Sequence, residues 1–444
     1  MAACNFIVHV KYILFYVSRL STLQESISPR KGANNIMFSL KVPPAFQNRS
    51  LILLLCARIS TTIAFQMLTV AVGWQIYSLT QMPFYLGLVG LVQFLPMFLL
   101  TLVVGYVADS YNRKLIICFS QIVESIGIFL LAFESHNGWI TKEGILFTLF
   151  FIGIANAFQG PSTQSLLPNV VRKELFPEVA ALATSTSQFA IIVGPAIGGV
   201  FYALNPVFTY SIAGILSLAT SVIILFISIR EEPPNSKPLT INSIFGGISF
   251  IRSRPIILGA ISLDLFAVLF GGATALLPIY ASNILKIGPF GLGLLRSAPA
   301  IGALIMSIFL TRKPLRKKEG YIMFIAVISF GISTVIFAVS SSIVLSLASL
   351  VVLGASDMVS VVVRSTLIPM ETPDNMRGRV NAINTMFIGT SNQLGGFESG
   401  LTAALFGVIP SVLFGGIGAI IIAILWMKLF PELLHVTKLG HSTD

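Results

Sequence analysis

The chain has 444 residues, of which 55% are hydrophobic and 10% are charged. Water-soluble domains carry about 25% charged residues on average, so this composition excludes a soluble protein and places most of the surface in lipid. The net charge of +11 comes from Lys and Arg residues in short segments between apolar runs, which favours a role in membrane topology and contact with anionic lipid over a nucleic-acid partner.

Residues 1–48 differ from the rest of the chain. Their one apolar patch, Phe6–Val17, is too short to cross a bilayer and is followed by no small-residue cleavage site. We interpret residues 1–48 as a disordered cytoplasmic extension. Because the sequence becomes regular from Met37, a translation start at Met37 is a hypothesis that the intact mass of the native protein would test.

The rest of the chain contains long apolar runs. A helix that crosses a bilayer needs about 20 apolar residues, so the fifty uncharged residues of Ile59–Ala108 make two spans. Because these runs are continuous rather than alternating, they indicate helices and not a β-barrel. The same reasoning predicts twelve spans, at residues 51–79, 84–108, 115–133, 144–168, 179–203, 207–229, 255–281, 290–311, 320–339, 343–365, 379–406 and 409–430.

The basic residues predict the orientation of these spans. Connections after even-numbered spans contain fifteen Lys and Arg residues, whereas those after odd-numbered spans contain only Lys142 and Lys286. The positive-inside rule therefore places the even-numbered connections and both termini in the cytoplasm.

A polar segment at residues 230–254 separates the spans into two six-helix halves, 49–229 and 255–430, with a cytoplasmic tail at 431–444. Its first part is a Pro-rich linker, and Ile241–Ile251 is expected to form a short surface helix. The halves also repeat at an offset of 201 residues, which relates "SLLP" at Ser165 to "TLIP" at Thr366, and Gly194 and Gly199 to Gly395 and Gly400. A parallel repeat of two six-helix halves is the organisation of major-facilitator transporters, with the substrate site between the halves.

The segment "GYVADSYNRK", Gly105–Lys114, lies between spans 2 and 3. It resembles the major-facilitator loop signature Gly-x-x-x-Asp-Arg-x-Gly-Arg-Arg/Lys. The resemblance implies that Gly105 allows a close helix approach and that Asp109 pairs with Arg113, beside Lys114. In the family this cluster joins the halves at the cytoplasmic side in the outward-open state.

Two positions depart from that signature. Ser110 replaces an Arg, which thins the charge network, and Asn112 replaces a Gly, which is milder because Asn tolerates a left-handed turn. The alternative interpretation is a turn that only fixes topology.

In span 5, "GPAIGG" resembles the antiporter signature of drug and proton exchangers in this superfamily. Pro195 removes a backbone donor and can bend the helix, while Gly194, Gly198 and Gly199 offer a face for close packing. The resemblance implies export, because importers usually lack the signature. The alternative is a tight helix crossing without directional meaning.

Two further stretches refine the resemblance. "NAFQG" at Asn156–Gly160 occupies the place of Arg-x-x-Gln-Gly in proton-coupled exporters, and its Asn156 stands at the Arg position, which leaves coupling open. "ETPDNMRGRVNAINTMFIGTSNQLGGFESG" resembles the loop between spans 10 and 11 in the branch of bacterial enterobactin and macrolide exporters. That loop contains Asp374, Arg377 and Arg379.

Four carboxylates, at Glu124, Asp264, Asp357 and Glu398, lie inside spans, where a charge costs roughly 2.5–3.5 kcal/mol on insertion scales. Three of them are candidate functional groups. Asp264 and Glu398 are in spans 7 and 11, which line or adjoin the cavity in family members, and Glu124 is in span 3. These are the candidates for binding protons or attracting a cation. For Glu124, a structural hydrogen bond is an equal alternative.

Three arginines are possible charge partners. Arg58 and Arg364 are expected to extend to the cytoplasmic surface. Arg296, in span 8, could instead neutralise Asp264 as a buried ion pair, and this pairing is the alternative to a functional Asp264.

The sequence therefore predicts an all-α integral membrane protein with the major-facilitator fold. Its expected function is export of an amphipathic small molecule, drug-like or siderophore-like, across a bacterial cytoplasmic membrane by proton antiport, as a monomer. Phosphate-loop, zinc-protease and hydrolase motifs are absent from the sequence, and Cys4, Cys56 and Cys118 have no paired spacing. We therefore expect no enzyme, cofactor or metal. The alternatives are an importer or uniporter, or a membrane protein of this fold that transports nothing.

Overall fold

The computed structural model describes residues 48–171, 175–228, 241–315 and 318–436. All of them belong to one compact unit, Pro44–Asp444. Nearly all of the predicted extension, the Pro-rich part of the linker and the last eight residues of the tail lie outside the described residues.

The described residues form helices and no β-strand. In the first half the helices are α2 (Arg49–Thr80), α3 (Pro83–Ser110), α4 (Arg113–His136), α5 (Lys142–Val170), α6 (Phe176–Leu204) and α7 (Pro206–Leu225). In the second half the long helices are α9 (Pro255–Phe270), α11 (Gly288–Arg312), α12 (Glu319–Val339), α13 (Ile343–Met370), α14 (Asp374–Phe406) and α15 (Val408–Leu429). Two short helices, α8 (Ile241–Arg252) and α16 (Pro431–Leu434), lie at the start and end of the second half.

Eleven of the described helical segments are long and apolar enough to cross a membrane. The remaining predicted span, the eleventh (379–406), corresponds to α14, which is equally long but carries more polar side chains. Asn392, Gln393 and Gly396 of α14 line a cavity between the halves, which explains why this helix is less apolar than its neighbours. The prediction of a twelve-helix membrane protein is confirmed.

Local sequence signals set the helix ends. The Asn205 side chain accepts a hydrogen bond from the Val207 N–H, and Pro206 occupies the first turn of α7. Asn112 caps α4 in the same way by accepting from the Lys114 N–H, with an extended backbone (φ −63°, ψ 112°). The expectation that Asn112 supports a left-handed turn is therefore wrong, because this residue is a helix N-cap.

Span 7 is not the continuous helix that its apolar sequence suggests. After α9 the chain continues as the 3₁₀ turn η3 (Gly272–Leu276), α10 (Leu277–Ile279) and the π turn η4 (Tyr280–Ile284). Gly272 lies directly against Gly395 of α14, and Pro278 lacks the N–H that a regular helix would use. Irregular backbone of this kind is tolerated at membrane depth where it is buried in protein or lines a cavity.

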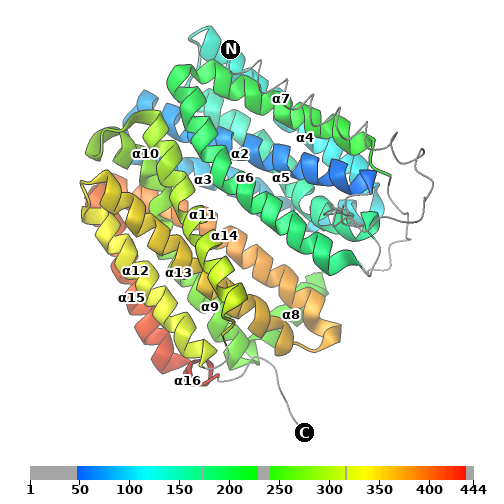
Figure 1. Ribbon diagram of the computed structural model, residues 1–444, viewed down its shortest axis with the longest axis vertical. Helices are drawn as coiled ribbons and strands as arrows, with labels where there is room; N and C mark the ends of the chain where they lie inside the picture. Colours follow the sequence, from blue (N-terminus) through cyan, green and yellow to red (C-terminus); the bar gives the residue numbers. More distant parts are fainter. Residues whose placement is uncertain (1–47, 172–174, 229–240, 316–317, 437–444) are drawn as a thin grey trace, which may run out of the picture. The chain divides into compact units, whose positions relative to one another are not determined.

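Figure 1 shows α2–α7, coloured blue to green, as one bundle and α9–α15, coloured green to red, as another. Glycines bring the two bundles into contact. A Cβ atom at Gly199 of α6 would lie 2.6 Å from the Pro289 carbonyl oxygen of α11, and one at Gly400 of α14 would lie 2.5 Å from the Gly87 Cα of α3. Spans 5 and 8 thus meet as spans 11 and 2 do, in agreement with the 201-residue repeat.

The same repeat holds inside each half. A Cβ atom at Gly194 of α6 would lie 2.7 Å from the Gln66 Cβ of α2, and one at Gly395 of α14 would lie 2.8 Å from the Leu269 carbonyl oxygen of α9. Each of these glycine helices therefore packs against the first helix of its own half and crosses to the other half one turn further on.

The two ends of the bundle differ. We call the end at which α3, α5, α7, α11 and α13 finish the basic end, after the Lys and Arg residues that follow these helices in the sequence, and the other the opposite end. Among the described residues, three hydrogen bonds join the halves: Gln188 to the Ala300 carbonyl, Ser297 to the Ile192 carbonyl, and Asn283 to the Tyr77 hydroxyl. They lie between the middle of the helices and the opposite end.

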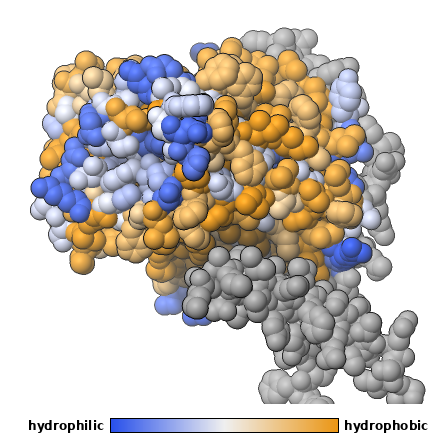
Figure 2. Space-filling model, turned by 90° about the horizontal axis from the view of Figure 1, so that it is seen from above, coloured by the Kyte–Doolittle hydropathy of each residue, from blue (hydrophilic) through white to orange (hydrophobic). Residues whose placement is uncertain are grey.

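The outer surface is suited to lipid. Figure 2 shows one face on which hydrophobic side chains cover broad areas and hydrophilic ones gather in patches. Large apolar side chains such as Phe119 and Leu405 are exposed, which water would disfavour but hydrocarbon would not.

The glycine contacts predict a stability effect. Gly400→Leu should force α3 and α14 apart and cost about 1–3 kcal/mol or more through overpacking. The unfolding midpoint of the purified protein in detergent measures this loss. Gly378→Leu is the matched control on the same helix, because a Cβ atom there meets no described atom within 4 Å. Equal midpoints for the two variants would contradict the close contact.

Candidate functional site

A cavity with a volume of about 470 Å³ lies between the two halves. A neighbouring space of about 190 Å³ shares five of its lining residues, so we treat the two as lobes of one central cavity. The shared residues come from both halves and are Gln66, Thr69, Thr274, Arg296 and Asn392.

The polar lining of the central cavity consists largely of side-chain amides. The Gln66 Nε2 donates to the Ile191 carbonyl at 3.4 Å, and the Gln188 Nε2 donates to the Ala300 carbonyl at 3.2 Å. Gln93 and Gln393 line the smaller lobe. Phe65, Phe330 and several aliphatic residues provide the apolar part of the wall, so the cavity suits a ligand that is partly polar and partly apolar.

Arg296 is the basic residue of this cavity and lines both lobes. Its guanidinium reaches from α11 towards Gly73 of α2, where a Cβ atom would lie 3.3 Å from the Nη2 atom. The Arg296 Nε atom is buried and has no hydrogen-bond partner among the described residues. No described carboxylate lies within the 4.0 Å limit of an ion pair with it.

Asp264 pairs with a different arginine from the one expected. Its Oδ2 atom lies 2.6 Å from the Arg364 Nη1 atom, and both residues are buried. The alternative of an Asp264–Arg296 pair is therefore wrong, and so is the expectation that Arg364 extends to the surface. The cause is the position of Arg364 on a face of α13 that packs against α9. Asp357, also on α13, interacts electrostatically with Arg364 and lines the larger lobe.

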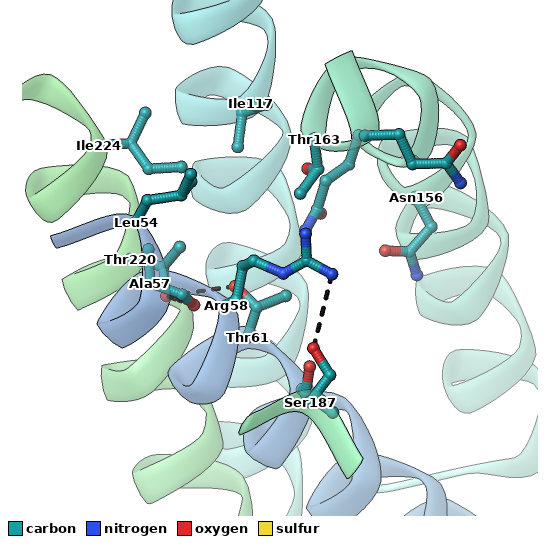
Figure 3. Close-up of a pocket in the computed structure, with 14 residues that line it drawn as sticks. Leu54, Ala57, Arg58, Thr61, Ile117, Asn156, Thr163, Ser187, Thr220 and Ile224 are labelled. Atoms are coloured by element: carbon teal, nitrogen blue, oxygen red, sulfur yellow. Dashed lines mark hydrogen bonds between the residues drawn. The ribbon is translucent and has the colours of Figure 1, made fainter. Parts of the chain in front are cut away.

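A second cavity, of about 260 Å³, lies within the first half and is lined by α2, α4, α5, α6 and α7. Figure 3 shows that the Arg58 side chain extends into it, with Asn156 and Thr163 on neighbouring walls. The Arg58 Nη2 atom lies 3.5 Å from the Ser187 hydroxyl. Arg58 therefore points into a cavity between helices, and the expected extension to the surface is not what the side chain does.

Glu124 of α4 is fully buried and connects to this second cavity. The Gln121 Nε2 donates to the Glu124 Oε2 at 2.8 Å and also lies 2.7 Å from the Gln159 Oε1. The Thr61 hydroxyl donates to the Gln121 Oε1 at 3.4 Å. Because Thr61 and Gln159 line the second cavity, a short chain of hydrogen bonds links the Glu124 carboxyl to it.

Glu398 is less well placed than the other two carboxylates. Its side chain is partly buried and is reached by the Ser399 hydroxyl at 3.5 Å. It is not among the residues that line the central or the second cavity.

The loop signature between α3 and α4 is only partly described, because the Asp109 side chain lies outside the described part of the chain. No described atom lies within 4 Å of a Cβ atom at Gly105, so the expected close approach at Gly105 is absent from this conformation. The Lys114 Nζ donates to the Ile227 carbonyl at 3.0 Å and so binds a segment of its own half. Arg113 begins α4.

The corresponding loop of the second half is exposed. Arg377 and Asp374 form an ion pair at 2.8 Å on the first turn of α14. Arg379 lies beside Gly247 of α8, so the short helix α8 packs against the start of α14.

The "GPAIGG" segment has a clear structural place. Gly194 and Gly198 pack against Gln66 and Met67 of α2, whereas Gly199 packs against α11 of the other half. Pro195 lines the central cavity, and a Cβ atom at Gly293 would lie 2.5 Å from its carbonyl oxygen. The helix α6 is continuous through Pro195.

Sequence reasoning missed two parts of this arrangement. Asp357 and Arg364 are recognisable as ionisable residues of one span, but their interaction is not predicted. Their spacing of seven residues places both on the same helix face and was a usable signal for it. The amides of the central cavity also carried a signal, because polar side chains inside apolar spans usually face a cavity or a partner.

A family model described as "Transmembrane secretion effector" matches residues 43–437. The enterobactin exporter EntS of Escherichia coli K12 is 24% identical over 401 residues, which cover 89% of this chain and 94% of the relative. The enterobactin exporter EntS of Citrobacter koseri is 25% identical over 399 residues, with the same coverage.

Solved structures show the same fold. A bacterial homologue of the human lysosomal transporter Spinster, inward-facing and unoccupied, superimposes with a TM-score of 0.71 at 12% identity, covering 88% of this chain and 98% of the other. A point variant of the nucleoside transporter NupG gives a TM-score of 0.69 at 14% identity, covering 86% of this chain and 100% of the other.

The charge cluster around Arg364 predicts an asymmetry between two variants. Arg364→Met leaves Asp264 and Asp357 without a cation and should cost about 3–5 kcal/mol, as loss of one partner of a buried pair does. Asp264→Asn should cost less, because Asp357 remains beside Arg364. Thermal unfolding of the purified protein in detergent gives both losses. If Asp264→Asn lowers the stability more than Arg364→Met does, Arg364 does not compensate the charge of both carboxylates.

Proposed function

This chain belongs to the transmembrane secretion effector family of major facilitator superfamily transporters, and we propose that it exports an amphipathic small molecule in exchange for protons. The observation that carries the proposal is the central cavity, whose polar and apolar wall is contributed by both halves. A cavity between two repeated six-helix halves is where transporters of this organisation bind their substrates, and rocking of the halves gives alternating access.

Two observations support export. The curated relatives reported above carry the name enterobactin exporter, and "GPAIGG" of α6 resembles the antiporter signature. In this chain that signature forms the contact between α6 and α11, so it lies where the halves must separate and rejoin during transport.

The contacts between the halves suggest that this conformation is open towards the cytoplasm. The hydrogen bonds that join the halves lie from the middle of the bundle to the opposite end, and the positive-inside rule assigns the basic end to the cytoplasm. The central cavity would then receive its substrate from the cytoplasmic side of a bacterial inner membrane. The loop signature at Gly105–Lys114 would join the halves in the opposite state.

Two buried carboxylates are the best candidates for proton coupling. Asp264 is ion-paired with Arg364 beside the central cavity, and Glu124 is linked to the second cavity by hydrogen bonds. Protonation of either group would remove a charge and weaken these interactions. Arg58 supplies, from α2, a positive charge in the cavity that Asn156 lines.

Import or uniport is the second candidate function. The observation that favours it is Asn156, which stands where proton-coupled exporters of similar sequence have Arg. A single twelve-span chain contains both halves, so we propose that the transporter acts as a monomer.

Proton coupling predicts that a pH gradient drives transport and that loss of the coupling carboxylates removes this effect. In vesicles of inside-out orientation, a pH gradient with the acidic side within should accelerate dye accumulation by the wild type. Asp264→Asn and Glu124→Gln should remove most of this acceleration while dye exchange without a gradient continues, because an amide cannot bind and release the proton. Glu398→Gln is tested beside them and should have the smallest effect. An undiminished gradient response in all three variants would contradict coupling through these carboxylates.

The loop signature predicts a second functional effect. Asp109→Asn should lower dye transport by about tenfold, equivalent to about 1.4 kcal/mol, because the outward-open state would lose a charged contact at the basic end. Initial rates in the same vesicles measure it, and the amount of inserted protein is the control. Full activity would mean that the segment is only a turn.

A further inference from the structure

We propose that Arg296 is the charge-selective group of the central cavity and that the substrate is an organic anion with an apolar body. This inference rests on the proposed function, since it assigns a substrate class to the same cavity. It concerns ligand charge, about which the export proposal alone says nothing.

The first argument is the charge balance around Arg296. A guanidinium that leaves water is stable only if a carboxylate or several hydrogen-bond acceptors compensate it. Among the described residues no carboxylate pairs with Arg296, and its buried Nε atom has no acceptor. The central cavity therefore holds a cation for which the described residues provide no carboxylate partner.

The second argument is the distribution of the acids. Asp264 is ion-paired with Arg364, and Asp357 interacts with the same guanidinium. These two carboxylates thus share one arginine on the α9–α13 side of the cavity. Arg296 stands apart from them on α11 and extends towards Gly73 of α2.

The third argument is the setting of the Arg296 guanidinium. It lies in both lobes, among the amides of Gln66, Asn392 and Gln393. Amide N–H groups can donate to an anionic oxygen beside the guanidinium, which can itself donate two parallel hydrogen bonds to a carboxylate or a similar anion. Phe65 and Phe330 provide apolar contacts for the rest of the ligand.

The position of Arg296 also connects ligand binding to the two halves. The side chain begins on α11 of the second half and ends beside α2 of the first. An anion bound to it would contact groups of both halves at once. The charge of the bound anion would therefore be compensated by Arg296 in the space between the two halves.

Two dyes of similar shape and opposite charge test the proposal. Fluorescein is the anionic probe, and a cationic rhodamine ester with the same three-ring core is its counterpart. Binding of each dye to the purified full-length protein in lipid nanodiscs is measured by fluorescence anisotropy. We expect the wild type to bind fluorescein at least about tenfold more tightly than the rhodamine.

Arg296→Gln should remove this preference, and Arg296→Lys should keep part of it, because the charge remains but the planar fork is lost. Arg312→Gln is the matched control, since Arg312 lies at the exposed end of the same helix, and it should keep the wild-type preference. The proposal is overturned if the wild type binds both dyes alike. It is also overturned if Arg296→Gln weakens both dyes equally.

Vesicle transport of the same dyes separates this inference from the proposed export. A wild type that binds fluorescein with the expected preference but moves neither dye would overturn export of such compounds and support the anion site. A wild type that exports the rhodamine and not fluorescein would support export and overturn the anion site.

Discussion

The free-energy cost of placing a charge inside a membrane protein determines how the ionisable side chains of this molecule are arranged. Hydrocarbon offers a charged group no partner, so each such group must find one in the protein, in a hydrated cavity or in a ligand. Asp264, Arg364 and Asp357 satisfy this requirement among themselves on the α9–α13 side. Glu124 satisfies it through Gln121 and the hydrogen bonds that lead to the second cavity. Arg296 forms no ion pair with a carboxylate of the described residues, and it lies in the cavity between the halves.

Small residues give the halves a surface on which they can meet without locking together. The contacts of Gly199 with α11 and of Gly87 with Gly400 bring backbones close without interdigitated side chains. Few hydrogen bonds accompany them among the described residues, and two of these use a backbone carbonyl as the acceptor. An interface of this kind depends on the close fit of backbones at one end of the bundle. When the halves rock, contacts at that end can break and contacts at the other end can form. The repeat supports this motion, since in each half one glycine of the pair packs against the first helix of that half and the other packs against the other half.

The fold could be predicted from the sequence because the signals that specify it extend over many residues and agree with one another. Apolar runs, Asn-Pro breaks and the bias of Lys and Arg each extend over many residues, and the helices begin and end close to where they predict. The exceptions are local. Asn112 is a helix cap rather than a left-handed turn, because one side-chain hydrogen bond to the Lys114 N–H decides its conformation. Span 7 changes its helical type after Gly271, because its backbone meets Gly395 of a helix more than a hundred residues away in sequence.

Charge pairing was the part that sequence reasoning could not settle, for a physical reason. A helix position fixes the depth of a side chain and the face on which it lies, but the partner depends on which neighbouring helix covers that face. Arg296 is nearer to Asp264 in sequence than Arg364 is, yet the packing of α9 against α13 gives the contact to Arg364. The same packing leaves Arg296 in the cavity. The residue considered from sequence as a neutralising partner of Asp264 is, in the folded chain, a cation without a carboxylate partner among the described residues, and this difference points to the charge of the ligand.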